Sequence, residues 1–340
     1  MDLNVQERGG GQRPPSARRV VTFTANPSID KTVALGGPLA RGEVQRAVSV
    51  TEQAAGKGVN VARVVAEAGV EATAVLPFDD TAYRAMLDAA VPTAMAVDAP
   101  GVRHRPRTNT TITEPGGTTT KVNEPGPTLS ASDLDAATAQ VVAAAAGAAW
   151  VALSGSLPPG APDDWYAQLA AALRPLGAKV AIDTSDAALD AVLAALPASA
   201  FDLVKPNSDE LAQLTGGDAA AFEAAAAAGD LADIVAAAKR LHERGITHVL
   251  VTLGGSGAVL VNAAGAWHAA APAIRVASTV GAGDSSVAGF ILGDVTGLDP
   301  ADCLAQAVAH GSAAASLPGT TLPTPDDLPP GRVVVTHLTA

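Results

Sequence analysis

The stretch TVGAGDSS, residues 279–286, places a single carboxylate, Asp284, behind two glycines and just before an apolar run that predicts a helix. Glycines let the backbone approach a ligand closely, and the positive end of a helix dipole favours an anion such as phosphate. An anion site is therefore one interpretation of these residues. The other is helix capping, because Asp is a preferred N-cap residue that satisfies free N–H groups in the first turn.

Five other short stretches carry side chains that can bind a polar ligand, and three of them also contain glycines. Asp30 can accept hydrogen bonds from a polyol, and Lys57 can meet an anion where Gly56 and Gly58 open the start of a helix. Ser154 follows a strand in a rigid loop that ends in Pro-Pro-Gly. The five stretches are NPSID at 26–30, AGKGVNVA at 55–62, SGSLPPG at 154–160, KPNSDEL at 205–211 and TLGGSGA at 252–258.

The stretch KPNSDEL supports two interpretations of Asn207 and Glu210. In the structural one, Asn207 caps a helix and Glu210, three residues later, bonds back to it as a capping box. In the chemical one, both side chains organise Mg²⁺ and its waters beside phosphates, because Mg²⁺ prefers hard oxygen donors. The hairpin expected at TLGGSGA likewise needs no ligand, but its glycines also permit close approach of a nucleotide.

From residue 20 onward, short β-branched runs alternate with alanine-rich helical segments. This alternation predicts the α/β class: a mostly parallel sheet with helices on both faces and ligands at the carboxyl ends of the strands. Two stretches, at about 31–53 and 103–123, are instead rich in Thr, Val, Arg and turn signals, and they predict a small separate β-sheet that serves as a lid. Ordinary surface excursions are the alternative. Residues 1–18 mix charge, Gly and Pro without an apolar core, which predicts a disordered tail.

Composition excludes several function classes. The 340 residues carry 22 Lys and Arg against 34 Asp and Glu, and this net charge of −12 argues against nucleic-acid binding. Cys303 is the only cysteine, so we expect neither an intramolecular disulfide nor a thiolate zinc cluster. The longest apolar stretch, residues 141–153, is too short to span a bilayer. We therefore expect a cytoplasmic protein whose partner is a small molecule, with no membrane contact.

In their order along the chain, these motifs resemble those of the PfkB (ribokinase-like) carbohydrate kinases, and within them the 1-phosphofructokinase and tagatose-6-phosphate kinase branch. The most specific element is TVGAGDSSVAGF, residues 279–290. The resemblance implies a ribokinase-like three-layer α/β/α sandwich with a small β-strand lid. It places the kinase domain at residues 19–318 and leaves 319–340 as a C-terminal extension. It also implies ATP as phosphoryl donor, a Mg²⁺ requirement and a homodimer formed through the lid.

The same resemblance assigns roles to individual residues. Asp284 matches the catalytic base, and the backbone of Gly281, Ala282 and Gly283 matches the anion hole for the transferred phosphoryl group. The lid positions that hold the phosphate already on the sugar are Arg46 and Arg107, and the other sugar-side positions are Asp30, Gly56, Lys57, Asn60 and Ser154. The nucleotide-side positions are Lys205, Asn207, Glu210, Thr252, Gly254 and Gly257, of which Asn207 and Glu210 also hold the metal through water.

The reaction implied is ATP-dependent phosphorylation of a hydroxyl of a ketohexose phosphate, with fructose 1-phosphate giving fructose 1,6-bisphosphate as the main expectation. Fructose 6-phosphate and tagatose 6-phosphate are alternative substrates, because Arg46, Lys57 and Arg107 can bind any phosphate. A non-catalytic sugar-phosphate sensor on the same fold is a further alternative. A dinucleotide-dependent oxidoreductase is disfavoured, because no G-x-G-x-x-G opens a helix after the first strand.

Overall fold

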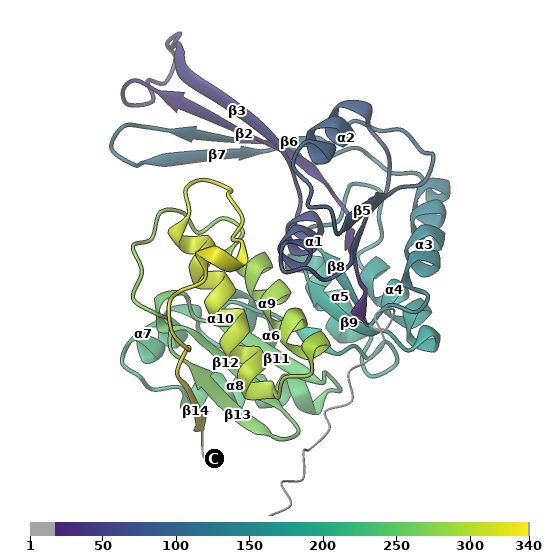
Figure 1. Ribbon diagram of the computed structural model, residues 1–340, viewed down its shortest axis with the longest axis vertical. Coiled ribbons are helices and arrows are strands. Elements are labelled where there is room, and N and C mark those ends of the chain that lie inside the picture. The colour runs from purple at the N-terminus through teal and green to yellow at the C-terminus, as the bar shows by residue number, and fades with distance from the viewer. Residues whose placement is uncertain (1–17, 339–340) are drawn as a thin grey trace, which may run out of the picture.

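The computed structural model describes residues 18–338, so the tail predicted for 1–18 lies outside the described residues except for Arg18. At the centre of the described chain is a ten-stranded sheet (Figure 1). Its strands, in chain order, are β1 (Val20–Thr24), β4 (Ala72–Val75), β5 (Met95–Asp98), β8 (Trp150–Ser154), β9 (Lys179–Asp183), β10 (Leu203–Val204), β11 (His248–Thr252), β12 (Ala258–Asn262), β13 (Gly265–Ala269) and β14 (Val335–Leu338).

Most of this sheet is parallel. The spatial order is β14-β13-β12-β11-β10-β9-β8-β1-β4-β5, and the strands from β11 to β5 pair in parallel. The other three, β12, β13 and β14, extend one edge in antiparallel pairing. Strand β14 belongs to the predicted C-terminal extension, so that extension adds the last strand to the sheet. Every residue of β1 and β8 is buried, as expected when helices cover both faces.

Helices cover both faces and give the three layers of the predicted fold class. One face carries α3 (Ala131–Ala145), α4 (Trp165–Leu173), α5 (Asp186–Ala194), α6 (Ser208–Thr215), α7 (Ala219–Ala227) and α8 (Ala232–Glu243). The other carries α1 (Lys57–Glu67), α2 (Thr81–Asp88), α9 (Ala282–Thr296) and α10 (Pro300–Ser316). Side chains alternate along a strand, so Phe23 of β1 packs in the apolar core under the first set of helices, and Val20 packs in the core under the second set. No helix among residues 18–338 is long and apolar enough to cross a membrane.

A separate four-stranded sheet, which we call the lid sheet, projects from the body (Figure 1). Its strands are β2 (Ser28–Leu35), β3 (Ala47–Ala55), β6 (Arg107–Thr113) and β7 (Thr119–Asn123), in the order β3-β2-β6-β7. Strands β2 and β6 pair in parallel, and the outer strands pair antiparallel to them. These strands come from the two stretches whose composition predicts a small sheet rather than surface excursions.

Candidate active site

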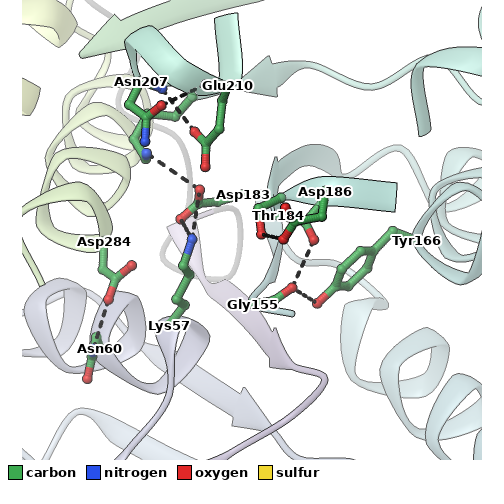
Figure 2. A network of polar contacts seen from close by, with 12 residues as sticks. Lys57, Asn60, Gly155, Tyr166, Asp183, Thr184, Asp186, Asn207, Glu210 and Asp284 are labelled. Atoms are coloured by element: carbon green, nitrogen blue, oxygen red, sulfur yellow. Dashed lines mark hydrogen bonds and ion pairs between the residues drawn. The ribbon is translucent and has the colours of Figure 1, made fainter. Parts of the chain in front are cut away.

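Five strands of the main sheet end where the loops with predicted binding residues begin. Gly56, the N-cap of α1, leads directly from β3 into a helix that packs against α9. Figure 2 shows side chains from α1, β9, α6 and α9 gathered in one region. Ligands bind at such strand ends in parallel sheets. The last residues of β1, β8, β9, β10 and β11 are Thr24, Ser154, Asp183, Val204 and Thr252.

Asp284 is the third residue of α9, and its side chain points toward α1 (Figure 2). Its Oδ2 accepts a hydrogen bond from Nδ2 of Asn60 at 2.8 Å, and the residue is only 7% exposed. The N-cap of α9 is Gly281, whose φ of 76° favours glycine, and no side chain in the described part of the chain caps this helix end. The capping interpretation of Asp284 is therefore wrong, because the turn at Gly281 occupies the cap position.

The surroundings of Asp284 make it a stronger base than an ordinary aspartate. Burial, followed by the negative charge of Asp183, raises the pKa of Asp284 to about 6, although Lys57, Asn60 and Lys205 act in the opposite direction. A carboxylate with this pKa is ionised at neutral pH and accepts a proton more readily than one with a pKa near 4. Asp284 thus has the burial and the pKa of a candidate general base.

Two lysines converge beside the start of α9, and one buried carboxylate holds both. Nζ of Lys57 lies 3.3 Å from Oδ2 of Asp183 (Figure 2). Nζ of Lys205 lies 3.5 Å from Oδ1 of the same carboxylate. A Cβ atom added at Gly283 would lie 3.2 Å from Nζ of Lys205, so this ammonium group adjoins the turn that starts α9. Positive charge beside a helix N-terminus is a suitable setting for a phosphate group.

A second group of polar side chains lies at the root of the lid sheet. Oδ1 of Asp30 accepts hydrogen bonds from Oγ of Ser28 at 2.9 Å and from Nδ2 of Asn109 at 3.2 Å. Oγ of Ser154 and Nε of Arg107 are buried and have no hydrogen-bond partner among residues 18–338. Burial lowers the pKa of Arg107, and the charge of Asp30 acts against that shift. Buried polar atoms without partners are what a polar ligand would satisfy.

Arg46 lies apart from this group, which corrects the expectation that it joins Arg107 at the phosphate already on the sugar. Arg46 is exposed and immediately precedes β3. At that end of the lid sheet Leu35 pairs with Ala47, whereas Arg107 pairs with Ser28 at the other end of β2. Strand β2 has eight residues, and its seven residue-to-residue steps separate the two ends by about 23 Å. The hairpin therefore carries Arg46 to the tip of the lid sheet, away from Arg107 of the same chain.

Asn207 and Glu210 form the predicted capping box at the start of α6. The N–H of Glu210 donates to Oδ1 of Asn207 at 2.8 Å, and the N–H of Asn207 donates to Oε2 of Glu210 at 2.9 Å. The structural interpretation of this motif is confirmed. The cap uses only one carboxylate oxygen, and Oε1 of Glu210 receives no hydrogen bond from any residue that the structure describes.

The glycines of the β11–β12 connection differ in their surroundings. Thr252 ends β11, and Gly254 opens the short 3₁₀ helix η3 (Gly254–Ser256). A Cβ atom added at Gly254 would meet no described atom within 4 Å, so space for a ligand remains beside it. A Cβ atom at Gly257 would lie 1.9 Å from the carbonyl oxygen of Ala269. Packing against β13 alone therefore requires glycine at 257.

Comparison with known proteins decides the class of this site. Residues 24–327 match the proteins described as "pfkB family carbohydrate kinase". The chain belongs to the pfkB family of carbohydrate kinases. As a member of this family it is a phosphotransferase whose acceptor is a sugar hydroxyl. The resemblance and the fold class predicted from the sequence are thus confirmed.

Relatives of this pfkB-family chain cover nearly all of its length. It is 39% identical to the 1-phosphofructokinase of Rhodobacter capsulatus over 315 residues, 91% of this chain and 94% of the relative. It is 35% identical to the 1-phosphofructokinase of Escherichia coli K12, over 82% of this chain and 84% of the relative. The structure of Escherichia coli phosphofructokinase-2 with substrates and products aligns at a TM-score of 0.79 with 29% identity, over 91% and 96% of the two chains.

One polar residue of this pfkB-family site is not predicted by the sequence motifs. Asp183 ends β9, in a segment that reads simply as a buried strand, KVAID. It is 3% exposed and touches both lysines. The sequence carries one indication of Asp183, which is a carboxylate at the end of an otherwise apolar strand, on the edge of the sheet where ligands bind. Its partners come from α1 and from the residue after β10, so only the fold reveals the contact.

Proposed function

We propose that this pfkB-family kinase transfers the γ-phosphoryl group of ATP to fructose 1-phosphate, giving fructose 1,6-bisphosphate and ADP. The observation that carries the reaction type is the buried Asp284 carboxylate next to the N-terminal turn of α9 and two lysines. The choice of sugar is supported by the relatives named 1-phosphofructokinase, which are 32–39% identical over most of the chain.

In the proposed reaction, Asp284 accepts the proton of the attacking sugar hydroxyl. The hydroxyl oxygen forms a bond to the γ-phosphorus as the bond from phosphorus to the ADP oxygen breaks. Backbone N–H groups of the turn from Gly281 through Ala282 to Gly283, together with Lys205, stabilise the charge on the transferred group. Phosphoryl transfer asks the protein mainly for such positioning and charge stabilisation.

On the sugar side, Asp30, Asn60 and Ser154 would bind hydroxyl groups, and Gly56 would leave room for the sugar at the start of α1. Nε of Arg107 has no hydrogen-bond partner among the residues that the structure describes, which supports a role for this guanidinium in binding the phosphate already on the sugar. Lys57 would add a second positive charge beside the acceptor. The position of Arg46 at the tip of the lid sheet gives it no part in the site of its own chain.

On the nucleotide side we assign Lys205, Thr252 and Gly254 to the phosphates and the loop around them. The donor set at Asn207 and Glu210 fits Mg²⁺, because the cap uses only Oε2 of Glu210 and no described residue donates to Oε1. Mg²⁺ is usually held by one or two carboxylates, waters and substrate phosphates. A bound Mg²⁺ would neutralise charge on the ATP phosphates. Gly257 belongs to the fold of this region rather than to nucleotide contact.

Replacing Glu210 with Gln should separate metal handling from capping. Gln retains an oxygen that can accept the Asn207 N–H but loses the charge, so we expect the Mg²⁺ concentration for half-maximal rate to rise several-fold with little change in Tm. Asp209→Asn, in the same helical turn and exposed, is the matched control and should leave the Mg²⁺ requirement unchanged. A normal rate at low Mg²⁺ in the Gln variant would leave Glu210 with its capping role alone.

We also propose a homodimer formed through the lid sheet. Strand register places Val33, Val50, Ile112 and Val122 on one face of this sheet, whereas Asp30 lies on the other. Val50 and Val122 are at least half exposed in the single chain, and a second copy would cover this apolar face. Sedimentation equilibrium that gives only the mass of one chain would contradict this assembly.

We further propose that the reaction takes place in the cytoplasm.

The sugar assignment is tested by kcat/KM for fructose 1-phosphate, fructose 6-phosphate and tagatose 6-phosphate with ATP and Mg²⁺. We expect fructose 1-phosphate to give the highest value. A higher value for another sugar would move the proposal to that substrate, with the same site residues. Phosphosugar binding without ADP release for all three would instead favour the sensor, since a fold does not guarantee activity.

A further inference from the structure

Asp183 is a charged residue at the centre of the site that the proposed reaction does not use directly. It is 3% exposed, and its two carboxylate oxygens face ammonium groups from two different elements. Lys57 begins α1, and Lys205 follows β10. Burial acts to raise the pKa of Asp183, but the charges of Lys205 and Lys57 hold it below its ordinary value. The carboxylate is therefore ionised at neutral pH.

The geometry makes Asp183 an indirect partner of the reacting groups. Lys205 stands between Asp183 and the turn before Asp284: its Nζ is 3.5 Å from Asp183 and 3.2 Å from the position of an added Cβ at Gly283. A lysine side chain is a flexible four-carbon stem with a point charge at its end. Two such stems need a fixed counter-charge to keep both ammonium groups at the turn when no phosphate is bound.

We propose that Asp183 is a positioning residue for phosphoryl transfer, a role that rests on the proposed function. Its carboxylate holds the ammonium groups of Lys57 and Lys205 beside the turn that begins α9, and its negative charge favours proton acceptance by Asp284. One side chain thereby links the charge that stabilises the transferred group to the base that activates the acceptor.

The charges around Asp284 support the second part of this role. The groups that act on its carboxylate are Asp183 from β9, Lys57 and Asn60 from α1, and Lys205 after β10. After burial, Asp183 is the largest influence that raises the pKa of Asp284, and the two lysines and Asn60 lower it. Without the Asp183 charge, burial alone would oppose the effect of the lysines on Asp284, so its proton affinity would fall.

The first test measures the titration of Asp284 in the ligand-free protein. NMR of protein labelled with ¹³C at the aspartate carboxyl carbons gives its midpoint, with the Asp284 signal assigned as the one missing in Asp284→Asn. We expect Asp183→Asn to lower this midpoint by roughly one pH unit or more, and kcat at pH 8 to fall by roughly tenfold. A role in folding alone would lower Tm and leave the Asp284 midpoint unchanged, which would overturn the proposal.

Asp183→Glu separates charge from position and keeps the cluster neutral overall, which protects folding. The Glu variant retains the negative charge, so the Asp284 midpoint should stay close to the wild-type value. Its longer side chain displaces both ammonium groups, so kcat should still fall several-fold. A wild-type kcat in this variant would overturn the positioning role, even where the Asn variant does not fold.

Turnover by the wild-type protein distinguishes failure of the proposed function from failure of the role of Asp183. Absence of turnover by the wild-type protein with every sugar phosphate would contradict the kinase proposal and, with it, the transfer role of Asp183. The NMR midpoints need no turnover. An active wild-type enzyme whose Asp284 midpoint is unmoved in Asp183→Asn would instead leave the kinase proposal standing and reject the role of Asp183.

Discussion

Replacing Asp284 with Asn is expected to lower kcat by roughly 10²–10⁴-fold, the usual contribution of a positioned general base. Asn has nearly the same size, and its Oδ1 can still accept the hydrogen bond that Asn60 donates at 2.8 Å. It cannot accept the proton of the sugar hydroxyl. Because the lost interaction belongs mainly to the transition state, affinities for ATP and phosphosugar, measured by calorimetry, should stay within about threefold of wild type.

Folding of the Asp284→Asn variant should be unimpaired. The N-cap of α9 is Gly281, so the cap does not depend on residue 284. The pKa of Asp284 in the folded protein, about 6, lies above that of an unfolded aspartate, so its ionisation costs stability as pH rises through this range. At pH 8 the neutral Asn removes that cost, and Tm should not fall.

The matched control lies at the other end of the same helix. Asp294 accepts hydrogen bonds from Nζ of Lys179 at 2.6 Å and from Nε1 of Trp150 at 2.8 Å, away from the site. Asp294→Asn should lower Tm and leave kcat close to wild type. If instead Asp284→Asn folds, binds both ligands and turns over within a few-fold of wild type, Asp284 is not the base.

Replacing Arg107 with Ala is expected to raise KM for the phosphosugar by roughly 10- to 100-fold, because a charge-assisted hydrogen bond contributes about 1.5–3 kcal/mol. Nε of Arg107 is buried and has no hydrogen-bond partner within the described part of the chain, and it feels the charge of Asp30, so the guanidinium is placed for a ligand. KM for ATP should hardly change. Steady-state kinetics with each substrate varied in turn measures both values.

A second substitution at Arg107 and a control at Arg103 show which property of Arg107 the phosphosugar needs. Arg107→Lys keeps the charge but loses the planar fork of donors, so part of the affinity should be lost. Arg103→Ala, in the segment just before β6, removes an exposed guanidinium that contacts Asp79 and Thr81, and should leave both KM values unchanged. Equal weakening of both substrates by Arg107→Ala would show that the residue supports the fold rather than the sugar phosphate.

Local patterns in the sequence suffice for most of the fold and part of the site. Alternation of β-branched and alanine-rich segments predicts the sheet and its helices, because burial on both faces demands apolar strands. The capping box at Asn207 and Glu210 is also local, since it joins residues three positions apart. The composition of the two stretches that form the lid sheet likewise predicts strands without helices.

Other parts of the site depend on contacts between distant segments. Asp183 meets Lys57 across 126 positions of the chain, and no spacing rule predicts that pair. The distance of Arg46 from Arg107 follows from the register of β2 with β3, which composition does not specify. Helix α9 is capped at Gly281 and not at Asp284, because Gly281 adopts a left-handed backbone conformation. Several residues of the motif could occupy the cap position, so the sequence alone does not specify which one does.

The role of Asp284 as the general base is tested by the ratio of kcat/KM for fructose 1-phosphate between wild type and Asp284→Asn, measured from pH 5 to pH 8. The second ionisation of a phosphate monoester also falls near pH 6, and the ratio removes it because both proteins use the same sugar. With a base of pKa about 6, activity is present above that pH and lost below it. We predict a ratio that is constant above about pH 7 and falls toward tenfold per pH unit below pH 6. A ratio that does not change between pH 5 and pH 8 would contradict the role of Asp284 as the base.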